Sequence, residues 1–214
     1  MAIFIGYHGT TRDKCRNIFK CKRFYPSRGD KHWLGDGVYF YLESFFAYRW
    51  CVLNCKNKMT SRLNAQCIID RYSIIEVDIN VEERRIFNID GIEHKSILME
   101  IYEEIKNLAE MSSKFKNVEM VEGVVLNYLF SILHYDKDFD IILATFPVDL
   151  FLYKNIKMRH AISEMQICVR NGSVINNMRE FDFSTEVDKY NHLWGNVYLE
   201  SDPKKNWYFP KFWA

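Results

Sequence analysis

Two glycines and an aromatic-rich run near the start of the chain have the residue types and spacing to bind a flat ring. The sequence reads Gly-Asp-Gly-Val-Tyr-Phe-Tyr over 35–41, and Trp50 stands eleven positions after Tyr39. A strand followed by a helix over this stretch would fold back on itself, so Tyr39 and Trp50 could face each other across one cleft. Gly35 and Gly37 allow the backbone to approach a ligand closely.

A second piece with chemical potential lies upstream. Tyr7-His8-Gly9-Thr10 ends a short apolar run, so it offers an imidazole and bare backbone where a strand should end. Together the two pieces suggest a nucleotide site.

Composition limits the class of protein. With 214 residues, 48% of them apolar, the chain is long enough to form one domain, 1–214, with its own core. Its 29 basic and 28 acidic residues nearly cancel, so net charge gives no strong attraction to nucleic acid or an anionic membrane, although a local basic face stays open. The N-terminus does not resemble a signal peptide, and no apolar run reaches the length of about 18 residues that suggests a membrane span. We expect a cytoplasmic protein.

The six cysteines are scattered without a CxxC pair, which favours reduced thiols. Cys51 and Cys55, one helical turn apart, could in principle hold a metal with His32 or His94. The paired ligand spacings of structural zinc sites are missing, so we expect no metal.

The periodicity of apolar residues predicts an α+β protein. Strands are expected at 2–7, near 38–41, at 67–70, 72–81 and 139–146, where Pro147 closes the strand, and at 164–169 with a hairpin return at 174–175. Helices are expected from a Thr10 to Asp13 start to about residue 20, and at 43–56, 93–109 and 118–134.

A third piece completes a pattern: a carboxylate opens a late strand, Glu164-Met165-Gln166-Ile167-Cys168-Val169. The three pieces, in this order, resemble the diphtheria-toxin-like ADP-ribosyltransferases, the group that includes the poly(ADP-ribose) polymerases. The signature of that family is a histidine, a tyrosine and a glutamate. The resemblance covers about 3–52 and 160–176.

The resemblance implies a split antiparallel β-sheet with flanking helices that grips NAD. His8 would hydrogen-bond an adenosine ribose hydroxyl, and the Gly9 backbone would hold the nicotinamide carboxamide. Tyr39 and Trp50 would stack on the nicotinamide ring, and the catalytic Glu164 would bind the 2′-hydroxyl of the nicotinamide ribose. The remaining residues expected to contact NAD are Thr10, Gly37 and Gln166.

The chemistry needs these residue types. Cleavage between nicotinamide and ribose passes through an oxocarbenium-like state, which a nearby carboxylate stabilises. The nicotinamide ring is cationic in NAD, so an aromatic face attracts it.

The sequence departs from the family pattern in two ways. Many members carry a serine three positions before the second aromatic residue, where this chain has Ala47, and Ser44 is the nearest hydroxyl. An alignment two residues later would instead place Gln166 at the catalytic position, which would weaken transferase activity and leave a slow NAD hydrolase or a pseudoenzyme.

We therefore expect an ADP-ribosyltransferase that moves ADP-ribose from NAD onto a macromolecule. The alternatives are an NAD glycohydrolase, a non-catalytic module that binds a nucleotide or a protein, and an RNA 2′-phosphotransferase, whose histidine and arginine set is not found. The loop before the catalytic strand, with Arg159 and His160, would touch the acceptor. Arginine is a poor acceptor because Ile162 stands where arginine-modifying members carry a glutamate. A protein is favoured slightly over nucleic acid because no other long basic track is evident.

Overall fold

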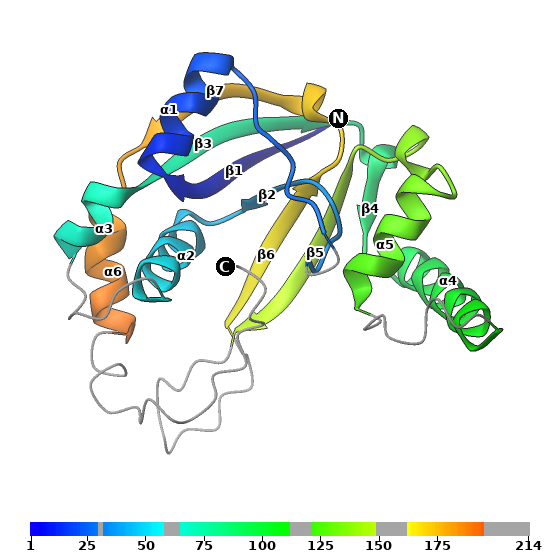
Figure 1. The fold of residues 1–214 in the computed structure, drawn as a ribbon. Helices are drawn as coiled ribbons and strands as arrows, with labels where there is room; N and C mark the ends of the chain where they lie inside the picture. Colours follow the sequence, from blue (N-terminus) through cyan, green and yellow to red (C-terminus); the bar gives the residue numbers. More distant parts are fainter. Residues whose placement is uncertain (30–31, 58–64, 112–120, 149–161, 195–214) are drawn as a thin grey trace.

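The computed structural model describes residues 1–29, 32–57, 65–111, 121–148 and 162–194 (Figure 1). The described strands are β1 (Ala2–Thr11), β2 (Val38–Tyr41), β3 (Tyr72–Val81), β4 (Ile86–Asn88), β5 (Ile141–Val148), β6 (Ile162–Val169) and β7 (Ile175–Phe181). The α-helices are α1 (Arg12–Cys21), α2 (Ser44–Asn57), α3 (Ala65–Arg71), α4 (Ile92–Met111), α5 (Glu122–Ser131) and α6 (Ser184–Trp194). Three short 3₁₀ turns, η1 (Glu83–Arg85), η2 (Tyr135–Lys137) and η3 (Gly172–Val174), complete the described elements.

All of these strands belong to one seven-stranded sheet with the order β4-β5-β6-β2-β1-β3-β7. The expected α+β class agrees with this architecture. The sheet is mixed and not wholly antiparallel, because β4 pairs in parallel with β5 while the other neighbours pair antiparallel.

Local sequence explains several boundaries. The side chain of Thr11 caps α1 by accepting a hydrogen bond from the Lys14 amide at 3.4 Å, and Asp13 lies in the first turn, where the helix dipole favours a carboxylate. In the second half of β3, buried Val77, Ile79 and Val81 alternate with less buried residues, as expected for a strand with unequal faces.

The expected strand at 67–70 is wrong, since these residues lie in α3. The Gln66 side chain donates to Asp70 at 2.7 Å, a pair four residues apart that supports a helix, while Ile68 packs inward. A short apolar run cannot by itself distinguish a strand from a buried helix.

Two further strand predictions need correction. Pro147 lies inside β5, opposite Ser163; the pairing of β4 with β5 stops at Leu143, so Pro147 stands where β5 has become an edge. The second correction concerns the strand expected to fold back on 164–169 as a hairpin at 174–175. This strand, β7, does not pair with β6. Because β5 and β2 already flank β6, β7 pairs with the free edge of β3. The sequence reading missed β4 and α6.

The sheet is covered unequally on its two faces (Figure 1). On β2, Val38 and Phe40 point into a core shared with α1, whereas Tyr39 and Tyr41 point to the opposite face. That opposite face carries two separate clusters, one under α2, α3 and α6 and one under α4 and α5. Tyr41 belongs to the first and Tyr39 to the second, so β2 spans the boundary between them.

Among the described helices, none is both long enough and apolar enough to cross a membrane.

Gly37 provides a test of the packing around Gly35-Asp36-Gly37, which we call the glycine loop. A Cβ at this position would collide with the Cys168 sulfur and lie 2.9 Å from the Val169 carbonyl oxygen. Gly37→Ala should therefore lower the free energy of unfolding by about 1 to 3 kcal/mol, as overpacking does. Urea denaturation measures this. Gly172→Ala is the matched control, because a Cβ there meets no atom within 4 Å; equal losses in both variants would contradict the close approach.

Candidate functional site

The backbones of β1 and β2 part after a single register pair, Tyr7 with Tyr41. The amide of Leu42 donates to Met165 of β6 at 3.1 Å. Hydrogen-bonding direction alternates along an antiparallel strand, so the backbone groups of Tyr41 and Tyr39 point the other way, toward β1. By the same alternation, those of Tyr7 and Gly9 point toward β2.

A loop residue closes the far end of this opening. Ser27 and Gly37 exchange two backbone hydrogen bonds, of 2.8 and 3.0 Å. Between this bridge and the Tyr7–Tyr41 pair, Gly9 and Tyr39 face each other without ladder pairing in the described β1 and β2. Backbone donors and acceptors are thus directed into a gap in the sheet.

The imidazole of His8 spans this gap on the α1 face. Its Nδ1 lies 2.8 Å from the Tyr39 carbonyl oxygen, and because a carbonyl only accepts, Nδ1 carries the proton. Burial lowers the pKa of His8, which favours the neutral ring. The neutral ring leaves Nε2 as a hydrogen-bond acceptor, while the Phe24 ring packs edge-on at 5.3 Å.

The lack of a side chain at Gly9 lets α2 approach β1. A Cβ at this position would lie 2.8 Å from the Ala47 carbonyl oxygen and 2.9 Å from Cε3 of Trp50. The Trp50 indole therefore rests directly against the Gly9 backbone, and its ring also meets Tyr72 edge-on with centroids 6.2 Å apart.

Tyr39 occupies the neighbouring cluster. The residue is 7% exposed and belongs to the α4–α5 core. Its hydroxyl donates to the Gly35 carbonyl at 2.6 Å and accepts from the Leu34 amide at 3.1 Å. Burial raises the pKa of this hydroxyl, so it stays protonated. The sequence predicted a slot with Tyr39 and Trp50 facing each other. In the structure the two side chains lie on one face of the sheet but pack in different clusters, with Gly9 next to both.

Glu164 lies on β6 in a largely buried polar cluster. Arg49 of α2 donates to its Oε2 at 3.1 Å and Gln166 donates to its Oε1 at 2.6 Å. The side chains of Arg49 and Glu164 are only 13% and 12% exposed. Burial raises the pKa of Glu164, while the Arg49 charge and the Gln166 hydrogen bond oppose that rise.

The sheet register connects this cluster to the gap. Gln166 is the β6 partner of Tyr41, which in turn pairs with Tyr7. Glu164 and Gln166 share the face that carries Tyr39 and Tyr41, because side chains alternate along a strand. The carboxylate, the guanidinium and the amide therefore lie toward the Tyr7–Tyr41 end of the opening: Gln166 is level with that pair, and Glu164 stands two residues farther along β6, away from Tyr39.

The other expected residues are dispersed. Thr10 is 3% exposed and lies one residue beyond Gly9 in β1, and Gly37 lies at the Ser27 bridge. Ser44, the nearest hydroxyl to the missing serine, donates instead to Glu186 of α6 at 3.1 Å. Arg159 and His160 fall outside the described residues.

The sequence did not predict a role for Arg49. Its neighbours in the helix do not reveal that it pairs with Glu164 on a strand 115 residues away. The sequence also did not predict the fixation of the glycine loop by Asn127 and Arg170. The Asp36 amide donates to Asn127 at 2.7 Å, and Arg170 donates to the Asp36 carbonyl and to Asn127.

Comparison with known proteins gives one relative of high coverage. The chain is 37% identical over 209 residues to the uncharacterized protein MJ0359 of Methanocaldococcus jannaschii, an alignment that spans 91% of this chain and 94% of that protein. No protein-family model and no solved structure matches the chain.

The electrostatic role of Arg49 can be measured directly. Because the Arg49 charge lowers the pKa of Glu164, Arg49→Gln should move this pKa upward, and the carboxylate of the variant should ionise at higher pH than in the wild type. Carboxyl-carbon NMR of labelled glutamate follows the titration. Arg84→Gln is the control, since Arg84 is exposed and pairs with Glu82 at 2.7 Å; an unchanged Glu164 titration in Arg49→Gln would contradict the coupling.

Proposed function

The chain belongs to one family with MJ0359, and we propose that its site cleaves NAD and transfers ADP-ribose to a macromolecule. The observation that carries the proposal is that the buried Glu164 carboxylate lies on the same sheet face as the indole of Trp50, which rests against Gly9, a residue without a ladder partner in the described β2. Such an arrangement offers hydrogen-bonding groups for a carboxamide, an aromatic face for a cationic ring and an anion for a developing oxocarbenium ion.

NAD would lie across the gap between β1 and β2. The Gly9 amide and carbonyl suit the nicotinamide carboxamide, which needs one donor and one acceptor. Trp50 suits the pyridinium ring, with an attraction of about 0.5 to 2 kcal/mol. His8 offers its Nε2 as an acceptor for a ribose hydroxyl, because the Tyr39 carbonyl fixes the proton on Nδ1.

The reaction would break the bond between C1′ of the ribose and the nicotinamide nitrogen. The bonding electrons leave with the nicotinamide, which departs neutral, while positive charge develops on the ribose. The Glu164 carboxylate accepts the 2′-hydroxyl hydrogen bond and stabilises that charge. A nucleophile of the acceptor then bonds to C1′ and releases its proton. Arg49 helps to keep Glu164 ionised in a setting where burial favours the neutral acid.

One observation favours a second candidate. Both carboxylate oxygens of Glu164 already accept hydrogen bonds within the protein, from Arg49 and Gln166. A ribose hydroxyl would have to share or displace these partners. An NAD glycohydrolase of low turnover, or a module that binds NAD without cleaving it, fits that arrangement and is the runner-up.

The carboxylate is tested by Glu164→Gln, which keeps the shape and removes the charge. Nicotinamide release from NAD should fall about a hundredfold or more while NAD affinity changes little, as expected for a contact that matters in the transition state. Chromatographic assay of nicotinamide measures turnover. Gln166→Ala should have the smaller effect; the reverse order would assign the catalytic position to Gln166.

The indole is tested by Trp50→Leu. Loss of stacking typically costs about 1 to 3 kcal/mol, so calorimetry should show NAD binding weakened about tenfold or more. Phe45→Leu is the control, because Phe45 lies on the same helix but packs against Phe46. Equal NAD affinity in the two variants, both folded by circular dichroism, would remove Trp50 from the site.

A further inference from the structure

The near-neutral net charge conceals a strong segregation of charge. Residues 12–28 contain seven basic side chains and one acidic one, whereas the rest of the chain has 22 basic and 27 acidic residues. The basic members are Arg12, Lys14, Arg16, Lys20, Lys22, Arg23 and Arg28. We call residues 12–28 the basic segment; it comprises α1 and the first part of the loop that follows.

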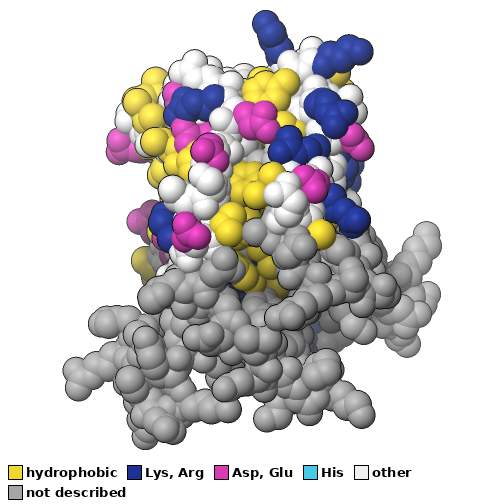
Figure 2. Space-filling view, turned by 90° about the vertical axis from the view of Figure 1, so that its left-hand side faces the viewer, with side chains coloured by type: hydrophobic (Ala, Val, Ile, Leu, Met, Phe, Trp, Pro, Cys, Tyr) yellow, Lys and Arg dark blue, Asp and Glu magenta, His cyan; other side chains and the backbone are white. Residues whose placement is uncertain are grey.

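The charges of the basic segment lie in solvent. All seven except the partly buried Arg12 are exposed. Figure 2 views the molecule from the left-hand side of Figure 1. Several Lys and Arg side chains lie in the upper part of this view, at the height of α1 in Figure 1. Asp13 pairs with Arg16 at 3.5 Å. Within the part of the chain that the structure describes, no ion pair involves Lys14, Lys20, Lys22, Arg23 or Arg28.

An exposed aromatic ring stands among these charges. Tyr25 is 64% exposed, and the Arg23 guanidinium lies 5.9 Å from the ring centroid. A solvent-facing ring beside cations is the combination with which proteins bind unpaired bases, the ring stacking on a base while the cations meet phosphates.

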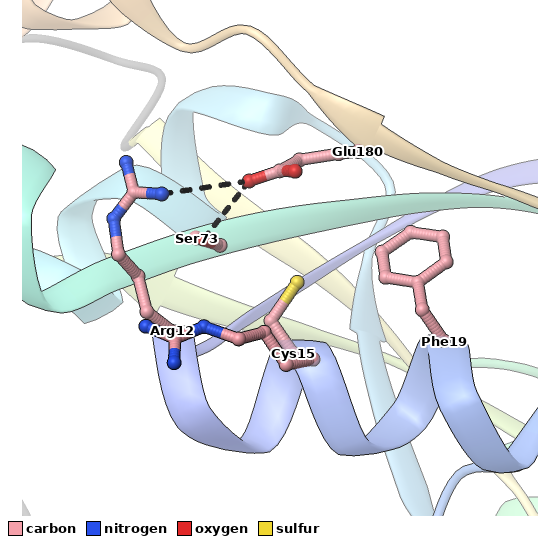
Figure 3. Close-up of a pocket in the computed structure, with 6 residues that line it drawn as sticks. Arg12, Cys15, Phe19, Ser73 and Glu180 are labelled. Atoms are coloured by element: carbon pink, nitrogen blue, oxygen red, sulfur yellow. Dashed lines mark hydrogen bonds and ion pairs between the residues drawn. The ribbon is translucent and has the colours of Figure 1, made fainter.

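A pocket lies against the same helix. It has a volume of about 420 Å³ and is lined by Arg12, Cys15, Arg16 and Phe19 of α1, Ser73 of β3 and Glu180 of β7 (Figure 3). Glu180 accepts from the Ser73 hydroxyl at 3.1 Å and lies 4.0 Å from Arg12. Arg12 and Arg16, whose backbones stand one turn apart, about 6 Å along the helix, thus border a hollow next to the exposed charges.

The basic segment also contacts the candidate site. Phe24 packs its ring against His8 with centroids 5.3 Å apart, and Ser27 forms the bridge to Gly37. The two contacts place the end of this segment at the α1-face edge of the gap between β1 and β2.

We propose that the basic segment binds single-stranded nucleic acid, with its cations on the phosphates and Tyr25 stacked on a base. The proposal goes beyond NAD cleavage and does not depend on it. It adds a second basic stretch to the one that the sequence predicts around Arg159 and His160. It also changes the expected partner from a protein to nucleic acid.

Fluorescence anisotropy of labelled single-stranded RNA and DNA, without NAD, tests the proposal. Wild-type protein should bind with a salt dependence that Lys20→Ala with Arg23→Ala flattens by about two units of slope. Tyr25→Ala should weaken binding of single strands about tenfold and binding of a duplex little. RNA and DNA arms of the titration show which sugar is preferred.

The control is Arg84→Ala with Lys106→Ala, which removes two exposed charges on η1 and α4 and should leave binding unchanged. An equal loss in this control, absence of binding at low salt, or competition by an acidic polypeptide with no effect of Tyr25→Ala would each overturn the proposal. Glu164→Gln should bind oligonucleotide like the wild type, so failure of NAD cleavage and failure of nucleic-acid binding are separate results.

Discussion

The hydrogen bond from His8 to the Tyr39 carbonyl links β1 to β2 at the level where their backbones no longer pair, beyond Tyr7 and Tyr41. One side-chain donor satisfies a carbonyl that the β1 ladder would otherwise satisfy, and the neighbouring Gly9 backbone stays directed into the gap. The same bond sets the tautomer of the imidazole. The separation of β1 from β2 is therefore both a structural feature and the source of the hydrogen-bonding groups on which the proposed NAD site depends.

The glycine loop gives this opening a firm edge. Gly35 has a positive φ of 71°, and the Asp36 backbone is bound through its amide to Asn127 and through its carbonyl to Arg170, so a residue of α5 and the residue that directly follows β6 hold one loop. The Arg170 guanidinium also lies 4.9 Å from the Phe130 ring centroid. On the other side α2 is pressed onto β1 at Gly9. Two differently packed halves of the sheet thus meet along β2, each with its own aromatic cluster.

Local patterns in the sequence predicted much of this. The alternation in β3, the cap before α1 and the strand-to-helix order around Tyr41 all appear in the structure, because each depends on neighbouring residues. Pairing could not be predicted in the same way. The partner of Arg49 lies 115 residues away, and the position of β7 depends on which strand edges are already occupied. Tyr39 was expected in an open slot, yet its ring is buried by helices whose packing no short motif encodes.

The most direct test of the account is a crystal structure of the Glu164→Gln variant with NAD. We expect the nicotinamide ring to lie against Trp50, its carboxamide to be hydrogen-bonded to the Gly9 backbone, and the nicotinamide ribose to lie beside residue 164. NAD bound elsewhere, for example in the pocket beside α1, or a gap between β1 and β2 that stays closed to the dinucleotide at saturating concentration, would contradict it.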